Sequence, residues 1–249
     1  MITGDGPPVV LLHGLFGAAR NLAGLSRGLS ARFRVVAMDL RNHGESPRAA
    51  GMGFEVMAAD VAETIARLGI TQAMVAGHSL GGKTAMMLAL MNPGLVARLA
   101  VLDIAPVSYN HGYDKYVQAM QAVVLSPDLT RAKADEILAP VVRDAAMRAF
   151  LLNNLVLGPN MRWRVGLDEI GAAMPDLLAW RDPPAVSPYR GPTLFLAGGL
   201  SDYVTPYADA AISRLFADVR RVTVEGASHW LHAEKPGEVV ASLEGFFSA

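Results

Sequence analysis

The octapeptide at positions 77–84, Gly-His-Ser-Leu-Gly-Gly-Lys-Thr, constrains the fold of this chain more than any other segment. An apolar run of strand length, Ala73–Ala76, lies directly before it. A helix-forming run from Lys83 to Met91 begins in its last two residues and ends before Asn92-Pro93-Gly94. A glycine-rich turn between a buried strand and a helix is typical of sheets whose strands alternate with helices. The octapeptide therefore predicts an α/β protein.

Runs of consecutive apolar residues support this fold class. Strands covered on both faces are apolar at successive positions, so these runs predict buried parallel strands. They lie at Val9–Leu12, Val35–Asp39, Ala73–Ala76, Leu99–Asp103, Thr193–Ala197 and Arg221–Val224. Helical patterns lie between them, as where Met57, Val61, Ile65 and Leu68 form one apolar face. We expect a mostly parallel sheet with helices on both faces.

One interval, from about position 104 to 192, breaks this alternation. It contains helix-like stretches but no convincing strand, at Asp114–Leu125, Thr130–Leu138, Val142–Asn153 and Arg164–Met174. A structureless loop of that length would be implausible in a compact protein. We therefore predict a core domain of residues 1–106 and 190–249. We expect residues 107–189 to form an inserted helical lid over the carboxyl edge of the sheet.

The octapeptide fits two catalytic patterns. From Gly77 to Gly81 it matches G-x-S-x-G, the nucleophile elbow of serine hydrolases. Over its full length it matches G-x-x-x-x-G-K-T, the phosphate-binding P-loop, which is the rarer pattern by chance. Asp103, at the end of a predicted strand, could serve as the magnesium-side aspartate of a nucleotide-hydrolysing enzyme. The octapeptide alone leaves both interpretations open.

The rest of the chain favours the nucleophile elbow. A serine hydrolase of this kind needs an amide donor after an early strand, an acid after a later strand and a histidine near the end. Val9–Gly17 is a strand that runs into a glycine-rich loop, and Leu196–Asp202 is a strand that runs into an acid. Gly226–Trp230 places His229 after the last predicted strand. A P-loop protein would leave these three segments unexplained.

Four segments along nearly the whole chain resemble serine hydrolases of the α/β-hydrolase fold. They are His13-Gly14, Asp39–Ser46, Gly77–Gly82 and Gly226–His229. Within that family, Leu102–Pro106 and Gly81–Met86 resemble a subgroup of small bacterial acyl esterases and thioesterases with a mitochondrial relative. Family members usually open with a β-hairpin, but only eight residues precede Val9. The resemblance implies an α/β-hydrolase fold, here with a shortened sheet of six or seven strands.

Ser79 is the predicted nucleophile and His229 the predicted general base. A serine hydroxyl needs a base to remove its proton, and an imidazole can accept and return a proton near neutral pH. Only His229 follows the last strand at the position where the order serine, acid, histidine requires the base. The other histidines lie in turn motifs, beside the nucleophile or in surface-like stretches, at His13, His43, His78, His111 and His232.

The acid and the oxyanion hole complete the predicted site. We favour Asp202 as the acid, because it follows the strand Thr193–Ala197 and precedes the histidine. Asp103 stays open as the alternative acid, since some relatives carry the acid after the strand next to the nucleophile. The backbone amides of Leu15 and Leu80 are expected to form the oxyanion hole.

Composition excludes several other classes of function. The formal net charge is −1, without long runs of either sign, which disfavours nucleic acid as a partner. The chain has no cysteine, so disulfides and thiol catalysis are excluded. We expect no membrane insertion, since no apolar run approaches about 20 residues. No signal peptide is visible, which favours a cytoplasmic location.

These observations predict a serine carboxylic-ester hydrolase that acts on esters or thioesters with an apolar acyl group. We expect a small-molecule substrate and no metal or organic cofactor, and the sequence leaves the oligomeric state open. The same fold and triad also serve lactonases, C–C-bond hydrolases and cofactor-free haloperoxidases, which remain alternatives. A P-loop nucleotide-binding protein is the more remote alternative, and a ligand receptor without catalysis is a third class.

Overall fold

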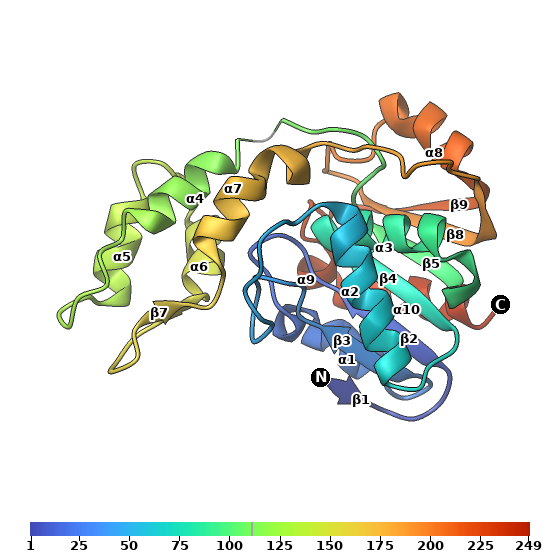
Figure 1. Cartoon of the computed structure of the whole chain (residues 1–249), viewed down its shortest axis with the longest axis horizontal. Helices are drawn as coiled ribbons and strands as arrows, with labels where there is room; N and C mark the ends of the chain where they lie inside the picture. Colours follow the sequence, from blue (N-terminus) through green and yellow to red (C-terminus); the bar gives the residue numbers. More distant parts are fainter. Residues whose placement is uncertain (111) are drawn as a thin grey trace. The chain divides into compact units, whose positions relative to one another are not determined.

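The computed structural model describes residues 1–110 and 112–249, and its main sheet has seven strands in the order β1-β3-β2-β4-β5-β8-β9 (Figure 1). The two-residue strand β1 pairs antiparallel with β3, and the other pairs are parallel. This confirms the predicted mostly parallel sheet. The strands are β1 (Ile2–Thr3), β2 (Pro8–Leu12), β3 (Arg34–Met38), β4 (Ala73–His78), β5 (Val96–Leu102), β8 (Tyr189–Gly198) and β9 (Phe216–Val224).

Alternate residues of the central strands supply the two buried faces of the sheet. Met74 and Ala76 of β4 belong to a core cluster with apolar residues of α1 and α10, so they point to one face. Val75 and Gly77 point to the other face, on which α3 packs against β4, β5 and β2 and in turn contacts α2. The helices of these two layers are α1 (Ala23–Leu29) and α10 (Pro236–Phe247), and α2 (Phe54–Arg67) and α3 (Leu80–Met91).

Shorter helices lie in the connections between the strands and the longer helices. Most are single turns of three or four residues. They are η1 (Ala19–Leu22), η2 (Pro93–Leu95), η3 (Pro206–Ala208), α8 (Asp209–Leu215) and α9 (Leu231–Glu234).

The chain divides into two compact units. The first holds the main sheet and comprises Met1–Leu40, Phe54–Val107 and Trp180–Ala249. The second comprises Arg41–Gly53 and Ser108–Ala179, so it ends before the expected boundary at 189 and includes a segment that the sequence assigned to the core. Its lid role stays a prediction.

The second unit is mainly helical, as the sequence predicted, but it also has a short hairpin. Strands of two residues are too short to show a periodicity, so this hairpin could not be predicted from the sequence. Arg48 of the first segment donates a hydrogen bond to the carbonyl of Trp163 in this hairpin at 2.7 Å. The elements are α4 (Asp114–Gln121), α5 (Arg131–Leu138), α6 (Ala145–Leu152), β6 (Leu155–Val156), β7 (Arg162–Trp163) and α7 (Leu167–Leu178).

Three glycines allow α3 to lie close to the strands behind it. A Cβ atom on Gly81 would lie 2.4 Å from the carbonyl oxygen of Leu12 in β2. On Gly77 it would lie 2.1 Å from the carbonyl oxygen of Gly81, and on Gly82 it would lie 2.5 Å from a methyl group of Ile104. The glycines of the octapeptide therefore serve the packing of a helix against strands.

Gly81→Ala is expected to lower the free energy of unfolding by about 1–3 kcal/mol, because the added methyl group meets fixed backbone atoms. Gly245→Ala is the matched control: Gly245 lies inside α10, and a Cβ atom there meets nothing within 4 Å. That variant is expected to gain about 0.5–1 kcal/mol, since glycine costs a helix interior conformational entropy. Urea unfolding of both variants measures the difference, and a Gly81→Ala protein as stable as wild type would contradict the packing argument.

Candidate active site

Ser79 occupies a sharp turn at the carboxyl end of β4. Its backbone has φ 52° and ψ −117°, a conformation that non-glycine residues rarely adopt. The Ser79 amide donates to the carbonyl of Leu102 at the end of β5, and its carbonyl accepts from the amide of Lys83, both at 3.0 Å. The side chain is half-buried at the first residue before α3. This geometry is that of a nucleophile elbow.

The octapeptide does not form a phosphate-binding loop. Its last five residues, Leu80–Thr84, already belong to α3, so no open loop precedes the lysine. Lys83 is buried, and its Nζ atom lies 5.3 Å from the centre of the Phe54 ring. Burial lowers the pKa of Lys83 to about 7. A P-loop lysine needs to reach a phosphate, so the P-loop interpretation of the sequence is wrong.

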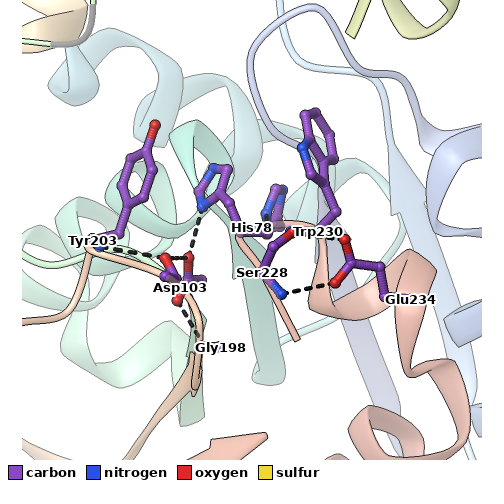
Figure 2. A network of polar contacts seen from close by, with 9 residues as sticks. His78, Asp103, Gly198, Tyr203, Ser228, Trp230 and Glu234 are labelled. Carbon is purple, nitrogen blue, oxygen red and sulfur yellow. Dashed lines mark hydrogen bonds and ion pairs between the residues drawn. The ribbon is translucent and has the colours of Figure 1, made fainter. Parts of the chain in front are cut away.

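His229 pairs with Asp103. Its Nδ1 atom donates to Asp103 Oδ2 at 2.7 Å, and the Asp103 side chain is fully buried at the carboxyl end of β5. Asp103 also accepts hydrogen bonds from the amide of Gly198, at 2.8 Å, and from the hydroxyl of Ser201. Figure 2 shows these contacts converging on the Asp103 carboxylate. The bond to Nδ1 leaves Nε2 of His229 as the nitrogen that can accept a proton.

Asp202 lies outside this network. Its side chain is exposed, and no hydrogen bond or ion pair joins it to His229 in the described part of the chain. The preceding residue, Ser201, contributes its hydroxyl to Asp103 instead. The turn after β8 therefore supplies a hydroxyl at the place where we expected it to supply a carboxylate.

Tyr203 packs against the imidazole of His229, a contact that the sequence did not indicate. The two rings are stacked with centroids 3.8 Å apart and planes 14° from parallel. Tyr203 is buried, and its amide donates to Ser201 Oγ at 3.3 Å. A ring held in this way restricts rotation of the imidazole and keeps water from one of its faces. In the sequence, Tyr203 stands out only because it directly follows Asp202, the acid that we favoured.

A carboxylate closes the loop that carries His229. Glu234 accepts from the amide and from the hydroxyl of Ser228, each at 2.7 Å (Figure 2). These hydrogen bonds from Ser228 lower the pKa of the Glu234 carboxyl group. The two ends of the segment 228–234 are thereby tied together, with His229 between them.

The remaining histidines have other surroundings. His13 is buried, donates from Nδ1 to the carbonyl of Gly14 at 2.8 Å and accepts at Nε2 from the amide of Leu40 at 3.0 Å. His43 forms a hydrogen bond with the carbonyl of Arg41 at 2.9 Å, so both histidines make hydrogen bonds to the main chain. His111 lies outside the described residues.

The two predicted oxyanion donors belong to segments next to Ser79. Leu15 is in the turn closed by the bond from Gly17 N to Gly14 O at 2.9 Å, and Leu80 is the first residue of α3. A Cβ atom on Gly14 would lie 3.3 Å from Cβ of Ser79, so this turn is next to the serine. The first amides of a helix have no acceptor within the helix, which leaves that of Leu80 suited to an anion. The role of both amides stays a prediction.

The burial of His232 predicts how the free energy of unfolding changes at acidic pH. Burial, with a smaller contribution from His229, lowers its pKa to about 4, and its Nδ1 atom has no hydrogen-bond partner among the described residues. Between pH 6.5 and about 4 the unfolded chain binds a proton that the folded chain excludes. The contribution of the neutral ring to the free energy of unfolding is therefore fully present above pH 6.5. As the pH falls towards 4, the free energy of unfolding decreases by up to about 3 kcal/mol.

His232→Phe is expected to flatten this pH dependence. Unfolding free energies of both proteins, measured from pH 7 to 4, should fall less steeply for the variant. Equal slopes would contradict the assignment of a neutral, buried His232.

Two further properties concern bound metals and membranes. Among residues 1–110 and 112–249, no group of three or more His, Cys, Asp or Glu side chains is arranged to hold a metal ion. No helix in the same residues is long and apolar enough to cross a bilayer.

Comparison with known proteins places the chain in a family. The family model described as alpha/beta hydrolase fold matches residues 7–236. The sn-1-specific diacylglycerol lipase ABHD11 of Mus musculus is 39% identical over 259 residues, which cover 100% of this chain and 84% of the mouse protein. Esterase YbfF of Escherichia coli K12 is 35% identical over 243 residues, which cover 97% of this chain and 93% of that protein.

A solved structure agrees with these sequence matches. The structure of a marine microorganism esterase is 33% identical, covers 99% of this chain and 97% of its own, and superposes with a TM-score of 0.94. The sheet order, the turn at Ser79 and these matches agree with one another. The chain belongs to the alpha/beta hydrolase fold family.

Proposed function

We propose that this protein is a serine hydrolase that cleaves carboxylic esters through an acyl-enzyme intermediate, with Ser79 as nucleophile, His229 as base and Asp103 as acid. The observation that carries the proposal is the 2.7 Å hydrogen bond between His229 and Asp103, at the edge of the sheet where the turn of Ser79 lies. Esterases and a lipase among the relatives support an ester bond as the target.

The first half of the reaction forms the acyl-enzyme. Ser79 Oγ attacks the carbonyl carbon of the ester while His229 Nε2 takes the hydroxyl proton. The negative charge moves to the carbonyl oxygen, where the amides of Leu15 and Leu80 would donate hydrogen bonds. When the carbonyl re-forms, the bond to the leaving oxygen breaks, and the proton on His229 passes to the departing alcohol.

The second half repeats the chemistry with water. His229 removes a proton from a water molecule, which attacks the acyl carbon, and the bond to Ser79 Oγ breaks as the proton returns to it. The products are a carboxylic acid and free enzyme. A thioester reacts in the same way with a thiol as the leaving group.

Asp103 serves this mechanism by holding His229 in one tautomer and one orientation. Its carboxylate faces the imidazolium that forms in each half of the reaction, and the bonds from Gly198 and Ser201 fix that carboxylate in place. We propose Asp103 as the acid in preference to Asp202, which the sequence favoured, because Asp202 is exposed and has no hydrogen bond to His229 in the described residues.

The class of substrate follows from the relatives and from the apolar character expected of an acyl pocket. The name of the mouse relative states action on diacylglycerol, which is a carboxylic ester of fatty acids. We propose esters with an apolar acyl chain as substrates of this chain also. Thioesters, lactones and the substrates of C–C-bond hydrolases and haloperoxidases are the alternatives that a substrate panel separates.

Ser79→Ala is expected to lower kcat for p-nitrophenyl esters by about 10⁴-fold or more, because no acyl-enzyme can form. A fluorophosphonate probe should label the wild-type protein and leave the variant unlabelled. A variant that is labelled at the wild-type rate would contradict Ser79 as the nucleophile. Comparison of ester chain lengths with acyl-CoA substrates then defines the acyl and leaving groups.

Asp103→Asn is expected to lower kcat by about 10³–10⁴-fold, because the amide favours the wrong tautomer of His229. Asp202→Asn is the matched control, an identical change at an exposed neighbouring carboxylate, and it is expected to retain most of the activity. Both variants are compared by kcat at pH 8 after circular dichroism confirms folding. The reverse ranking would return the acid to Asp202.

A further inference from the structure

We propose that His78, the residue before the nucleophile, is a positioning residue whose hydrogen bond to the main chain of His229 sets the separation of Ser79 and His229. The inference rests on the proposed function, since it concerns the same serine and histidine. It gives a role to a buried side chain that the mechanism above does not use.

The contact joins two segments that are distant in the sequence. Nε2 of His78 lies 2.8 Å from the carbonyl oxygen of His229. A carbonyl oxygen can only accept, so Nε2 carries the proton and donates it, which fixes the tautomer of His78. Because His78 is bonded to Ser79 through the chain, this hydrogen bond connects the nucleophile turn directly to the backbone of the proposed base.

The loop of His229 needs such a connection. Ser79 and Asp103 follow neighbouring strands, β4 and β5, whose main chains are joined by the ladder and by the bond from Ser79 to Leu102. His229 follows β9, which is separated from β5 by β8 in the sheet. Asp103 holds the imidazole, while His78 holds the backbone of the same residue, so ring and main chain are fixed from different strands.

The other nitrogen of His78 faces the loop of the predicted oxyanion hole. A Cβ atom on Gly14 would lie 2.9 Å from His78 Nδ1, so the absence of a side chain at position 14 leaves room for this ring. His78 is buried, so its ring is surrounded by other residues of the protein. His78 therefore packs against the loop of the predicted oxyanion hole and directly precedes Ser79. It also forms a hydrogen bond with the loop that carries His229.

The surroundings of His78 keep its ring neutral. Its centroid lies 4.7 Å from that of His229, 4.2 Å from that of His232 and 5.9 Å from that of Trp230. Burial, with the nearby His232 and His229, lowers the pKa of His78 well below its usual value. A neutral donor holds the carbonyl without placing a positive charge beside the imidazolium that His229 becomes during the reaction.

Two substitutions separate the hydrogen bond from the volume of the ring. His78→Phe keeps a ring but removes the donor, and it is expected to lower kcat for a p-nitrophenyl ester by about 10²-fold, the cost of a misplacement near 1 Å. KM should change little, because binding of the ester is not altered. His78→Gln retains an N–H at the position of Nε2 and is expected to recover most of the loss.

His232→Phe is the matched control for these variants. His232 is buried against the same His78 ring, but it forms no hydrogen bond with the carbonyl of His229 in the described residues. It is expected to retain the wild-type kcat at pH 8. A His78→Phe protein with wild-type kcat, or a folded His78→Gln protein no better than His78→Phe, would overturn the proposal.

A measurement on the unaltered protein covers the case in which His78→Phe does not fold. Nitrogen NMR of protein labelled at histidine should show His78 as the neutral tautomer with its proton on Nε2 throughout the pH range of the assay. A proton on Nδ1, or titration of His78 within that range, would overturn the proposal. This measurement does not depend on catalysis, whereas loss of the proposed function would appear as wild-type protein without hydrolysis or fluorophosphonate labelling.

Discussion

The close approach of α3 to the strands behind it is the constraint on which the rest of the structure depends. Gly81 lies so near to the carbonyl of Leu12 that a methyl group would not fit, and Gly77 lies equally near to Gly81 itself. This contact forces the chain to turn within one residue, and Ser79 takes the unusual backbone angles that the turn requires. The position of the Ser79 hydroxyl at the turn and that of the first amides of α3 beside it are consequences of that packing.

Much of the fold could be predicted because its signals are local. Apolar runs such as Val9–Leu12 and the apolar face along α2 follow from burial, and both appear in the structure with shifts of a few residues at their ends. The hairpin of β6 and β7 could not be predicted, since each strand has two residues. The segment Arg41–Gly53 joins the helical unit through contacts with residues such as Trp163, which are distant in the sequence.

The roles of the proposed site residues could be predicted from the sequence to different degrees. Ser79 and His229 stand in patterns with a defined place along the chain. The choice between Asp103 and Asp202 depends on how two neighbouring strands end, because β5 and β8 are adjacent and either turn could present a carboxylate. Asp103 adopts a positive φ of 51°, and Ser201 and Gly198 bind its carboxylate, none of which a sequence pattern specifies. Tyr203 carries no pattern at all.

The position of Asp103 along the chain has a consequence for how this protein could diversify. It precedes Ser108–Ala179, the main segment of the helical unit, whereas His229 follows that segment. The residues proposed as nucleophile, acid and oxyanion donors therefore all precede Ser108–Ala179, and only Arg41–Gly53 of the helical unit lies among them in the sequence. Exchange of the whole helical segment, as in recombination between relatives, would leave these four elements in their original reading order and context. The helical segment could then be replaced as a module, separately from the residues proposed to break the bond.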